Sequence, residues 1–276
     1  MSSSNPIRLP PRFEIRQLLA EHHDWAAAII SHANIYHSPA WSPIHADDKP
    51  QRTYGLFKGV DLFVAHSITS GFAYGVFDTE YEFKKPASAA TGGALYWDGD
   101  DLDDVTSADL VAQMDFPLVS IALAFDAFEA MGAAEIGPVL AWLPMMGVGV
   151  GILDGRFKAA TEAAKVTPQG PRQVLMRNGT ATRRDYEGLG LARRLGQWMM
   201  FEARDVWGFR AIQIDTASPA VDKTWMHPPE GSGMVSTKVC ALDMGTHEEE
   251  GNKVFAPADV VMSRVWVDLK PAAAEA

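Results

Sequence analysis

Residues suited to holding an anion gather in one turn, Glu187 to Ala192, in the second half of the chain. Its glycines, Gly188 and Gly190, leave room for main-chain N–H groups to approach a ligand. The start of a helix just after them adds unpaired N–H donors and a positive dipole end, so main chain would hold a phosphate or pyrophosphate here. Guanidinium groups suit phosphate oxygens. The turn is bracketed by Arg183, Arg184, Arg193 and Arg194. Plain turn chemistry is the alternative interpretation of two glycines before a helix.

A strand before the turn, and a helix and a second strand after it, must position these residues. Residues 173–182 carry Val, Leu, Met and Thr without a Pro, which favours a strand. After Gly190 apolar residues recur at steps of three and four, which predicts an amphipathic helix ending at Gly208. Residues 210–214 then read as a short strand.

At these residues the sequence resembles the GNAT superfamily of N-acyltransferases, whose turn reads Gln/Arg-x-x-Gly-x-Gly/Ala. Gly190 and Ala192 match the last two required positions, and Tyr186 supplies the aromatic residue that usually precedes the motif. Glu187 departs from it, because a carboxylate stands where Gln or Arg is usual. The family uses chiefly the backbone N–H of that position. The resemblance covers residues 173 to about 218 and is fainter elsewhere.

The resemblance implies acetyl-CoA as co-substrate and also implies which residues hold it. The pantetheine arm would pair with free main chain in a splay between the fourth and fifth strands, and the pyrophosphate would lie in the turn. The expected acetyl-CoA-binding residues are Thr180, Thr182, Arg184, Glu187, Gly188, Leu189, Gly190, Leu191, Ala192 and Arg193.

Catalytic groups depart further from the family pattern. The family commonly has an Asn at the start of the helix after the fifth strand and, seven residues on, a Tyr that protonates the CoA thiolate. Ser218 and Trp225 stand there instead, and an indole cannot serve as that acid. The family often places a carboxylate base on the fourth strand, yet residues 173–182 contain no Asp or Glu. The candidate catalytic residues are therefore Asp215 first, with His227 and Ser218, while capping or packing roles are the alternative for each.

An irregular aromatic stretch near the N-terminus is the predicted wall of the acceptor site. Residues 34–50 contain three prolines between polar and aromatic side chains, which favours a loop. In the family, the early helix and the loop after it often form this wall. The expected substrate-binding residues are Tyr36, His37 and Trp41.

Two groups of polar side chains have the residue types of a metal site. His37 and His45 lie near Asp47 and Asp48, but their spacing fits no standard ligand pattern. The acidic run at 98–104 lacks the glycine and the distal Glu of a calcium loop. No metal is expected.

The rest of the chain is expected to complete an α+β GNAT fold, with a mixed, mostly antiparallel central sheet flanked by helices. We expect one domain over residues 1–276 with flexible ends at 1–12 and 270–276. Residues 107–165 are predicted as a helical insertion between the third and fourth strands, which would cap the acceptor pocket, form a homodimer interface or merely enlarge the core. Further strands are predicted at 13–18, 72–83, 94–97, 234–242 and 260–269, and helices at 20–35 and 51–66.

Composition argues against several function classes. A formal charge of -11 is unsuited to a sequence-independent nucleic-acid binder, which needs a basic face. The one cysteine, Cys240, cannot form an internal disulfide, as is usual in a reducing compartment. The N-terminus lacks an apolar signal region, and the uncharged stretch 137–153 is too short and too rich in Pro and Gly to span a membrane. We therefore expect a soluble, cytoplasmic protein without nucleic-acid or membrane partners.

The resemblance to the GNAT superfamily implies an N-acetyltransferase that moves an acetyl or acyl group from acetyl-CoA to an amine of a small molecule by direct attack in a ternary complex. The competing hypothesis is a catalytically inactive GNAT-fold protein that binds acyl-CoA for sensing or assembly. It rests on Trp225, Glu187 and the missing strand carboxylate. A chance glycine turn in another fold is the third alternative. The long form with its insertion resembles GNAT members from fungi.

Overall fold

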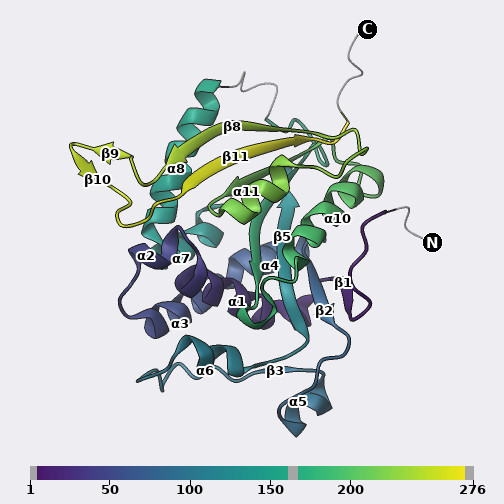
Figure 1. The fold of residues 1–276 in the computed structure, drawn as a ribbon, viewed down its shortest axis with the longest axis vertical. Coiled ribbons are helices and arrows are strands. Elements are labelled where there is room, and N and C mark those ends of the chain that lie inside the picture. The colour runs from purple at the N-terminus through teal and green to yellow at the C-terminus, as the bar shows by residue number, and fades with distance from the viewer. Residues whose placement is uncertain (1–4, 161–166, 271–276) are drawn as a thin grey trace.

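A seven-stranded sheet runs through the middle of the molecule and separates two faces (Figure 1). The computed structural model describes residues 5–160 and 167–270, so the outermost parts of the two predicted flexible ends lie outside the described residues. Neighbouring strands are antiparallel except for β6 and β7, which are parallel. In sheet order the strands are β1 (Phe13–Gln17), β2 (Tyr74–Asp78), β5 (Leu118–Asp126), β6 (Val174–Thr182), β7 (Ala211–Thr216), β11 (Val261–Asp268) and β8 (Val235–Asp243).

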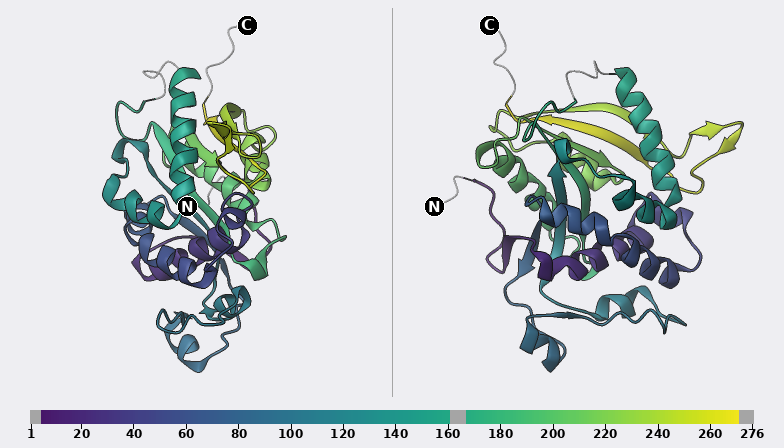
Figure 2. Two further views of the ribbon diagram at one scale, coloured as in Figure 1. Left: turned by 90° about the vertical axis from the view of Figure 1, so that its left-hand side faces the viewer. Right: turned by 180° about the vertical axis from the view of Figure 1, so that it is seen from behind.

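Helices cover both faces of this sheet, and Figure 2 shows the layers from the side. One core cluster joins the sheet to α1 (His23–His32), α2 (Trp41–Ile44), α3 (Lys49–Gly59), α4 (Asp61–Thr69), α7 (Ala133–Trp142) and α8 (Pro144–Ala160). The other cluster joins the sheet to α10 (Leu191–Asp205) and α11 (Pro219–Met226). The α+β class and the mostly antiparallel sheet are therefore as predicted.

Short elements complete the described part of the chain. They are the 3-10 turns η1 (Ala20–His22), η3 (Ala127–Glu129) and η4 (Arg184–Tyr186), the π-helical turn η2 (Ala33–His37), helices α5 (Pro86–Thr91) and α6 (Ser107–Ala112), and strands β3 (Ala94–Leu95), β4 (Met114–Asp115), β9 (Glu248–Glu249) and β10 (Asn252–Lys253).

The third strand of the sheet is not the segment that the sequence predicts. Residues 118–126 form β5 in the centre of the sheet, inside the stretch assigned to a helical insertion, so the insertion boundary at 107 is wrong. Every residue of β5 is buried, because helices cover both faces, and such a strand loses the alternation that marks a half-exposed one. The predicted strand at 94–97 is only β3, which pairs with β4 in a separate two-stranded sheet.

A shorter helical insertion does lie between the third and fourth strands of the sheet, as α7 and α8. Helix α7 packs on α3 and α4, and the indole of Trp142 lies so close to Gly55 of α3 that a Cβ there would be 2.3 Å from the ring. Helix α8 packs on β8 and β11. Residues 161–165 of the predicted insertion lie outside the described residues. Among the helices described, none is long and apolar enough to cross a membrane.

Candidate functional site

The parallel strands β6 and β7 separate part-way along their length. They pair only from Val174 to Arg177 on β6 and from Ala211 to Ile214 on β7. Strand β6 continues to Thr182 against β5, and β7 continues to Thr216 against β11. The sheet is therefore open between the two strands beyond this point.

Main-chain groups of β6 line this opening. The N–H of Arg183 donates to the carbonyl of Val119 on β5 at 2.9 Å, so residues 183 and 181 direct their polar groups to β5. By the alternation of an antiparallel ladder, the N–H and C=O groups of Thr180 and Thr182 point away from β5, where β7 no longer pairs. A bulge between Arg177 and Gly179 kinks the strand where the opening begins. An extended ligand with amide groups would find partners here.

The glycine turn follows β6 after the short turn η4 and precedes α10, in the order that the sequence predicts. Gly188 and Gly190 have φ values of 79° and 71°, a left-handed conformation that favours glycine. A Cβ at either position would meet nothing within 4 Å, so the space above the turn is open. Helix α10 begins at Leu191 without a side-chain cap, which leaves its first N–H groups available to an anion. Leu189 lies between the glycines and is 51% exposed.

The arginines around the turn have different roles. Arg184 forms an ion pair with Glu187 at 2.5 Å, so the unusual carboxylate of the turn is neutralised by a neighbour. Arg193 is exposed on the first turn of α10, whereas Arg194 donates to the carbonyl of Arg8 at 2.8 Å. Arg183, suggested by the sequence as a phosphate ligand, has a fully buried side chain held by Asp185. Arg184 and Arg193 are the guanidinium groups that remain accessible to an anion.

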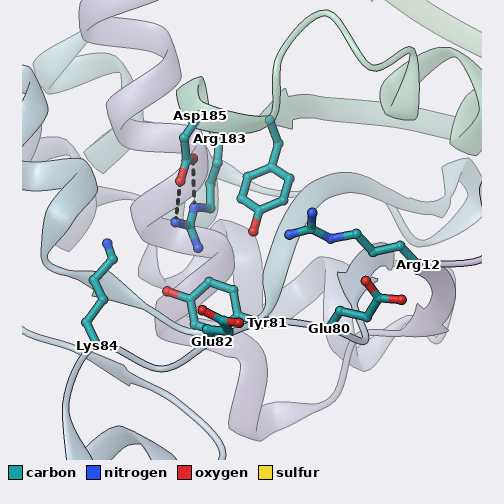
Figure 3. A pocket seen from close by; sticks show the side chains of 8 residues that line it. Arg12, Glu80, Tyr81, Glu82, Lys84, Arg183 and Asp185 are labelled. Carbon is teal, nitrogen blue, oxygen red and sulfur yellow. Dashed lines mark hydrogen bonds and ion pairs between the residues drawn. The ribbon is translucent and has the colours of Figure 1, made fainter.

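A cavity of about 470 Å³ beside the turn is lined by side chains that fix the turn in place (Figure 3). The hydroxyl of Tyr186 donates to Asp78 at 2.7 Å, and Arg12 pairs with the same carboxylate at 2.6 Å. Burial acts to raise the pKa of Asp78, but the hydrogen bonds from Arg12 and Tyr186 outweigh it and lower this pKa. Arg183 donates to the carbonyl of Phe116 at 2.8 Å. These side chains form hydrogen bonds and ion pairs with one another, so we infer that the cavity lining holds the turn in place.

The predicted acceptor residues divide into two groups. Tyr36 and His37 are half-buried in the π-helical turn η2, and both rings lie 5.0 Å, centroid to centroid, from that of His32. Burial lowers the pKa of His37, and the charge of Arg184, which precedes the glycine turn, lowers it further. Trp41 is 3% exposed within the core cluster, so its predicted role at the substrate site is replaced by packing.

His32 makes stability depend on pH. It is 2% exposed and bonds to the carbonyl of Ser107 at 3.1 Å, and burial, followed by the neighbouring His37, lowers its pKa to about 4. An unfolded histidine takes up a proton near pH 6.5, whereas the folded one does not, so stability present at neutral pH is lost as pH falls. We expect this residue to lower the free energy of unfolding by about 2 kcal/mol between pH 7 and pH 5.

Urea unfolding at both pH values measures this contribution. The loss of unfolding free energy from pH 7 to pH 5 should be smaller in His32→Gln than in the wild type, and His227→Gln, at an exposed position, should behave as the wild type. Equal losses in the wild type and His32→Gln would contradict the assignment.

The candidate catalytic residues are not brought together as a single group. Asp215 on β7 forms two hydrogen bonds of 2.6 Å to Arg264, so both its oxygens are engaged in an ion pair. Ser218 precedes α11 without a side-chain cap bond. His227 is exposed at the other end of this helix, bonded to the carbonyl of Lys223 at 2.8 Å. Ser218 and His227 stand nine positions apart on either side of α11, which separates them by about 13–14 Å.

Sequence reasoning missed Arg177, which is 2% exposed where β6 and β7 part. It donates to the carbonyl of Leu123 and to the hydroxyl of Thr180, the latter at 2.9 Å. A charged residue in an apolar strand was the available signal.

No group of His, Cys, Asp or Glu in residues 5–160 and 167–270 is arranged to hold a metal ion.

Comparison with known proteins extends these observations. No family model and no curated protein matches this chain. Among solved structures it is similar to the C-terminal condensation domain of Ebony in complex with beta-alanyl-dopamine, with 13% identity, a TM-score of 0.55 and coverage of 94% of this chain and 99% of that chain. It is also similar to a putative arylalkylamine N-acetyltransferase 7 from the yellow fever mosquito, with 8% identity, a TM-score of 0.59 and coverage of 94% and 88%. At these identities, the likeness is one of fold.

Proposed function

We propose that this chain, which has the GNAT fold, is an acyl-CoA-dependent N-acetyltransferase acting on the amine of a small molecule. One observation carries the proposal: the opening between β6 and β7 leads directly into the glycine turn at the start of α10. Free main chain for the pantetheine arm is thus followed along the chain by an open anion site for its pyrophosphate.

Each part of this arrangement has a distinct task. Main-chain groups of Thr180 and Thr182 pair with the amides of the pantetheine arm, while N–H groups from Gly188 to Ala192 hold the pyrophosphate. Arg193 adds positive charge near the phosphates, while Arg184 offsets the carboxylate of Glu187. Bound acetyl-CoA supplies a thioester carbonyl that an amine attacks directly. The protein contributes chiefly by holding donor and acceptor together, which is a large part of catalysis in such reactions.

Arylalkylamines are the acceptor class that we test first. The aromatic rings of Tyr36 and His37 lie 6.2 Å apart, centroid to centroid, and suit an aromatic substrate. The two structures with TM-scores of 0.55 and 0.59 carry arylalkylamine chemistry in their names, as beta-alanyl-dopamine and as an arylalkylamine acetyltransferase. We further propose that the protein is cytoplasmic. Formation of a homodimer is an alternative role of the helical insertion.

The second candidate function is acyl-CoA binding without turnover. Trp225 stands where the family carries its acid, β6 has no Asp or Glu, and Asp215 is engaged by Arg264. These observations favour a sensing or assembly role only if no other group assists the leaving thiolate.

Two measurements separate the candidates. Calorimetry with acetyl-CoA tests binding, and release of free thiol in the presence of arylalkyl and aliphatic amines tests turnover. Binding with thiol release supports the enzyme, and binding without release across the panel supports the second candidate. Absence of acetyl-CoA binding would overturn both.

A further inference from the structure

Arg177 differs from the other buried arginines in the described part of the chain. Arg183 is paired with Asp185, and Arg264 is paired with Asp215 and Asp154. Among residues 5–160 and 167–270, Arg177 has no carboxylate partner, and its Nε–H is buried without any hydrogen-bond acceptor. Burying an unpaired cation is costly, so such a residue needs a reason to persist.

The surroundings of this guanidinium keep it in one place. Its central carbon lies 5.6 Å from the centroid of the Trp225 ring on α11, which is itself 1% exposed. One nitrogen donates to the carbonyl of Leu123, opposite the bulge in β6. Burial lowers the pKa of Arg177 to about 9, and the group is still charged at neutral pH.

Thr180 connects this buried charge to the opening. Its hydroxyl oxygen accepts a hydrogen bond of 2.9 Å from Arg177, so its own hydrogen is directed elsewhere. Thr180 is half-buried, and no further partner of its hydroxyl is found among the described residues. Thr182 offers a contrast on the same strand, because its hydroxyl bonds to that of Ser120 at 2.8 Å. Thr180 is thus a polarised donor at the edge of the opening.

The position of this pair matches the reactive end of the donor. The strands part after Arg177, and the turn lies beyond Thr182, so an arm held at the turn extends back along β6 to the point of separation. The bulge between Arg177 and Gly179 lies at the same place. An anion that forms there would meet the hydroxyl of Thr180 with a cation directly behind it.

We propose that Thr180 donates a hydrogen bond to the departing CoA thiolate and that Arg177 is the positioning residue that orients and polarises this hydroxyl. The inference rests on the proposed function. The amine nitrogen forms a bond to the thioester carbon, the carbon–sulfur bond breaks, and its electron pair stays on sulfur. The proton of the amine goes to water, and the thiolate takes a proton from water after it leaves. This pair assists the leaving thiolate, which the indole of Trp225 cannot do.

The thiol of bound CoA tests the assignment without an amine substrate. Absorbance near the thiolate band, followed against pH, gives the ionisation constant of the thiol when CoA is bound. CoA that lacks the sulfur serves as the blank. In the wild type we expect bound thiol to ionise at least roughly tenfold more readily than free CoA, as a charge-assisted hydrogen bond would cause.

Variants distinguish this role from structural support. Thr180→Val and Arg177→Gln should each remove most of the enhancement, the double variant should remove little more, and Thr180→Ser should restore it. Thr216→Val on β7 is the matched control, because its hydroxyl donates to Asp222 at 3.1 Å instead of contacting a cation, and it should keep the enhancement. If Arg177→Gln does not fold, Arg177→Lys, which keeps the charge, is measured in its place.

The outcomes separate this inference from the function on which it rests. CoA that binds with an unperturbed thiol in the wild type would overturn the role of the pair and leave the proposed function standing. An equal loss in Thr180→Val and Thr216→Val would also overturn it. A protein that binds no CoA at all would overturn the proposed function itself.

Discussion

Replacing Gly190 by Trp is expected to weaken acetyl-CoA binding at least roughly 100-fold, or about 3 kcal/mol. Gly190 has a φ of 71° and lies at the start of α10, with open space where a side chain would project. An indole there would cover the N–H groups that we assign to the pyrophosphate. Calorimetry on both proteins measures the change.

The opposite end of the same helix provides a matched control. Gly208 follows α10, has a φ of 79° and is also surrounded by open space. A non-glycine residue at either position carries a left-handed backbone strain of about 1–2 kcal/mol. Gly208→Trp should therefore lose stability to a similar extent but keep acetyl-CoA affinity. Loss of binding in both variants, or in neither, would remove the turn as the phosphate site.

Asp215→Ala is expected to lower the free energy of unfolding by about 3 kcal/mol, because it leaves a buried arginine without its main partner. The side chain of Arg264 is 6% exposed and that of Asp215 is 24% exposed. Burial acts to lower the pKa of Arg264, but the bond to Asp215 outweighs it and the net shift is upward. Urea unfolding of the variant and the wild type measures the loss.

Asp154→Ala is the control for this prediction. Asp154 bonds to the same guanidinium at 2.6 Å but is 51% exposed, so its removal should cost less than about 1 kcal/mol. Acetyl transfer per folded molecule should survive Asp215→Ala, since the carboxylate serves structure. Unchanged stability together with abolished transfer would instead restore Asp215 as the catalytic base.

Local pattern was sufficient for the elements around the turn. The strand before it, the helix from Leu191 and the strand at Ala211 all stand where the sequence predicts them. Glycine conformation, apolar spacing and strand composition act over a few residues, so they can be read from neighbours in the chain.

The same method failed at β5, because burial on both faces removes the alternation that identifies a strand. It also failed at Trp41, where an aromatic residue in an irregular stretch packs in the core instead of lining a pocket. In both cases, the outcome depends on which distant elements cover the segment. The composition of the segment does not contain this information.

The sequence by itself determined the strand, turn and helix that form the candidate anion site, together with the α+β class. Tertiary structure alone decided that Asp215 is engaged by Arg264, 49 positions away in the chain, and that β6 and β7 part after Arg177. It also decided that a buried cation stands behind Thr180. Backbone preference is local, whereas the charge and the water around a side chain depend on residues brought together by folding.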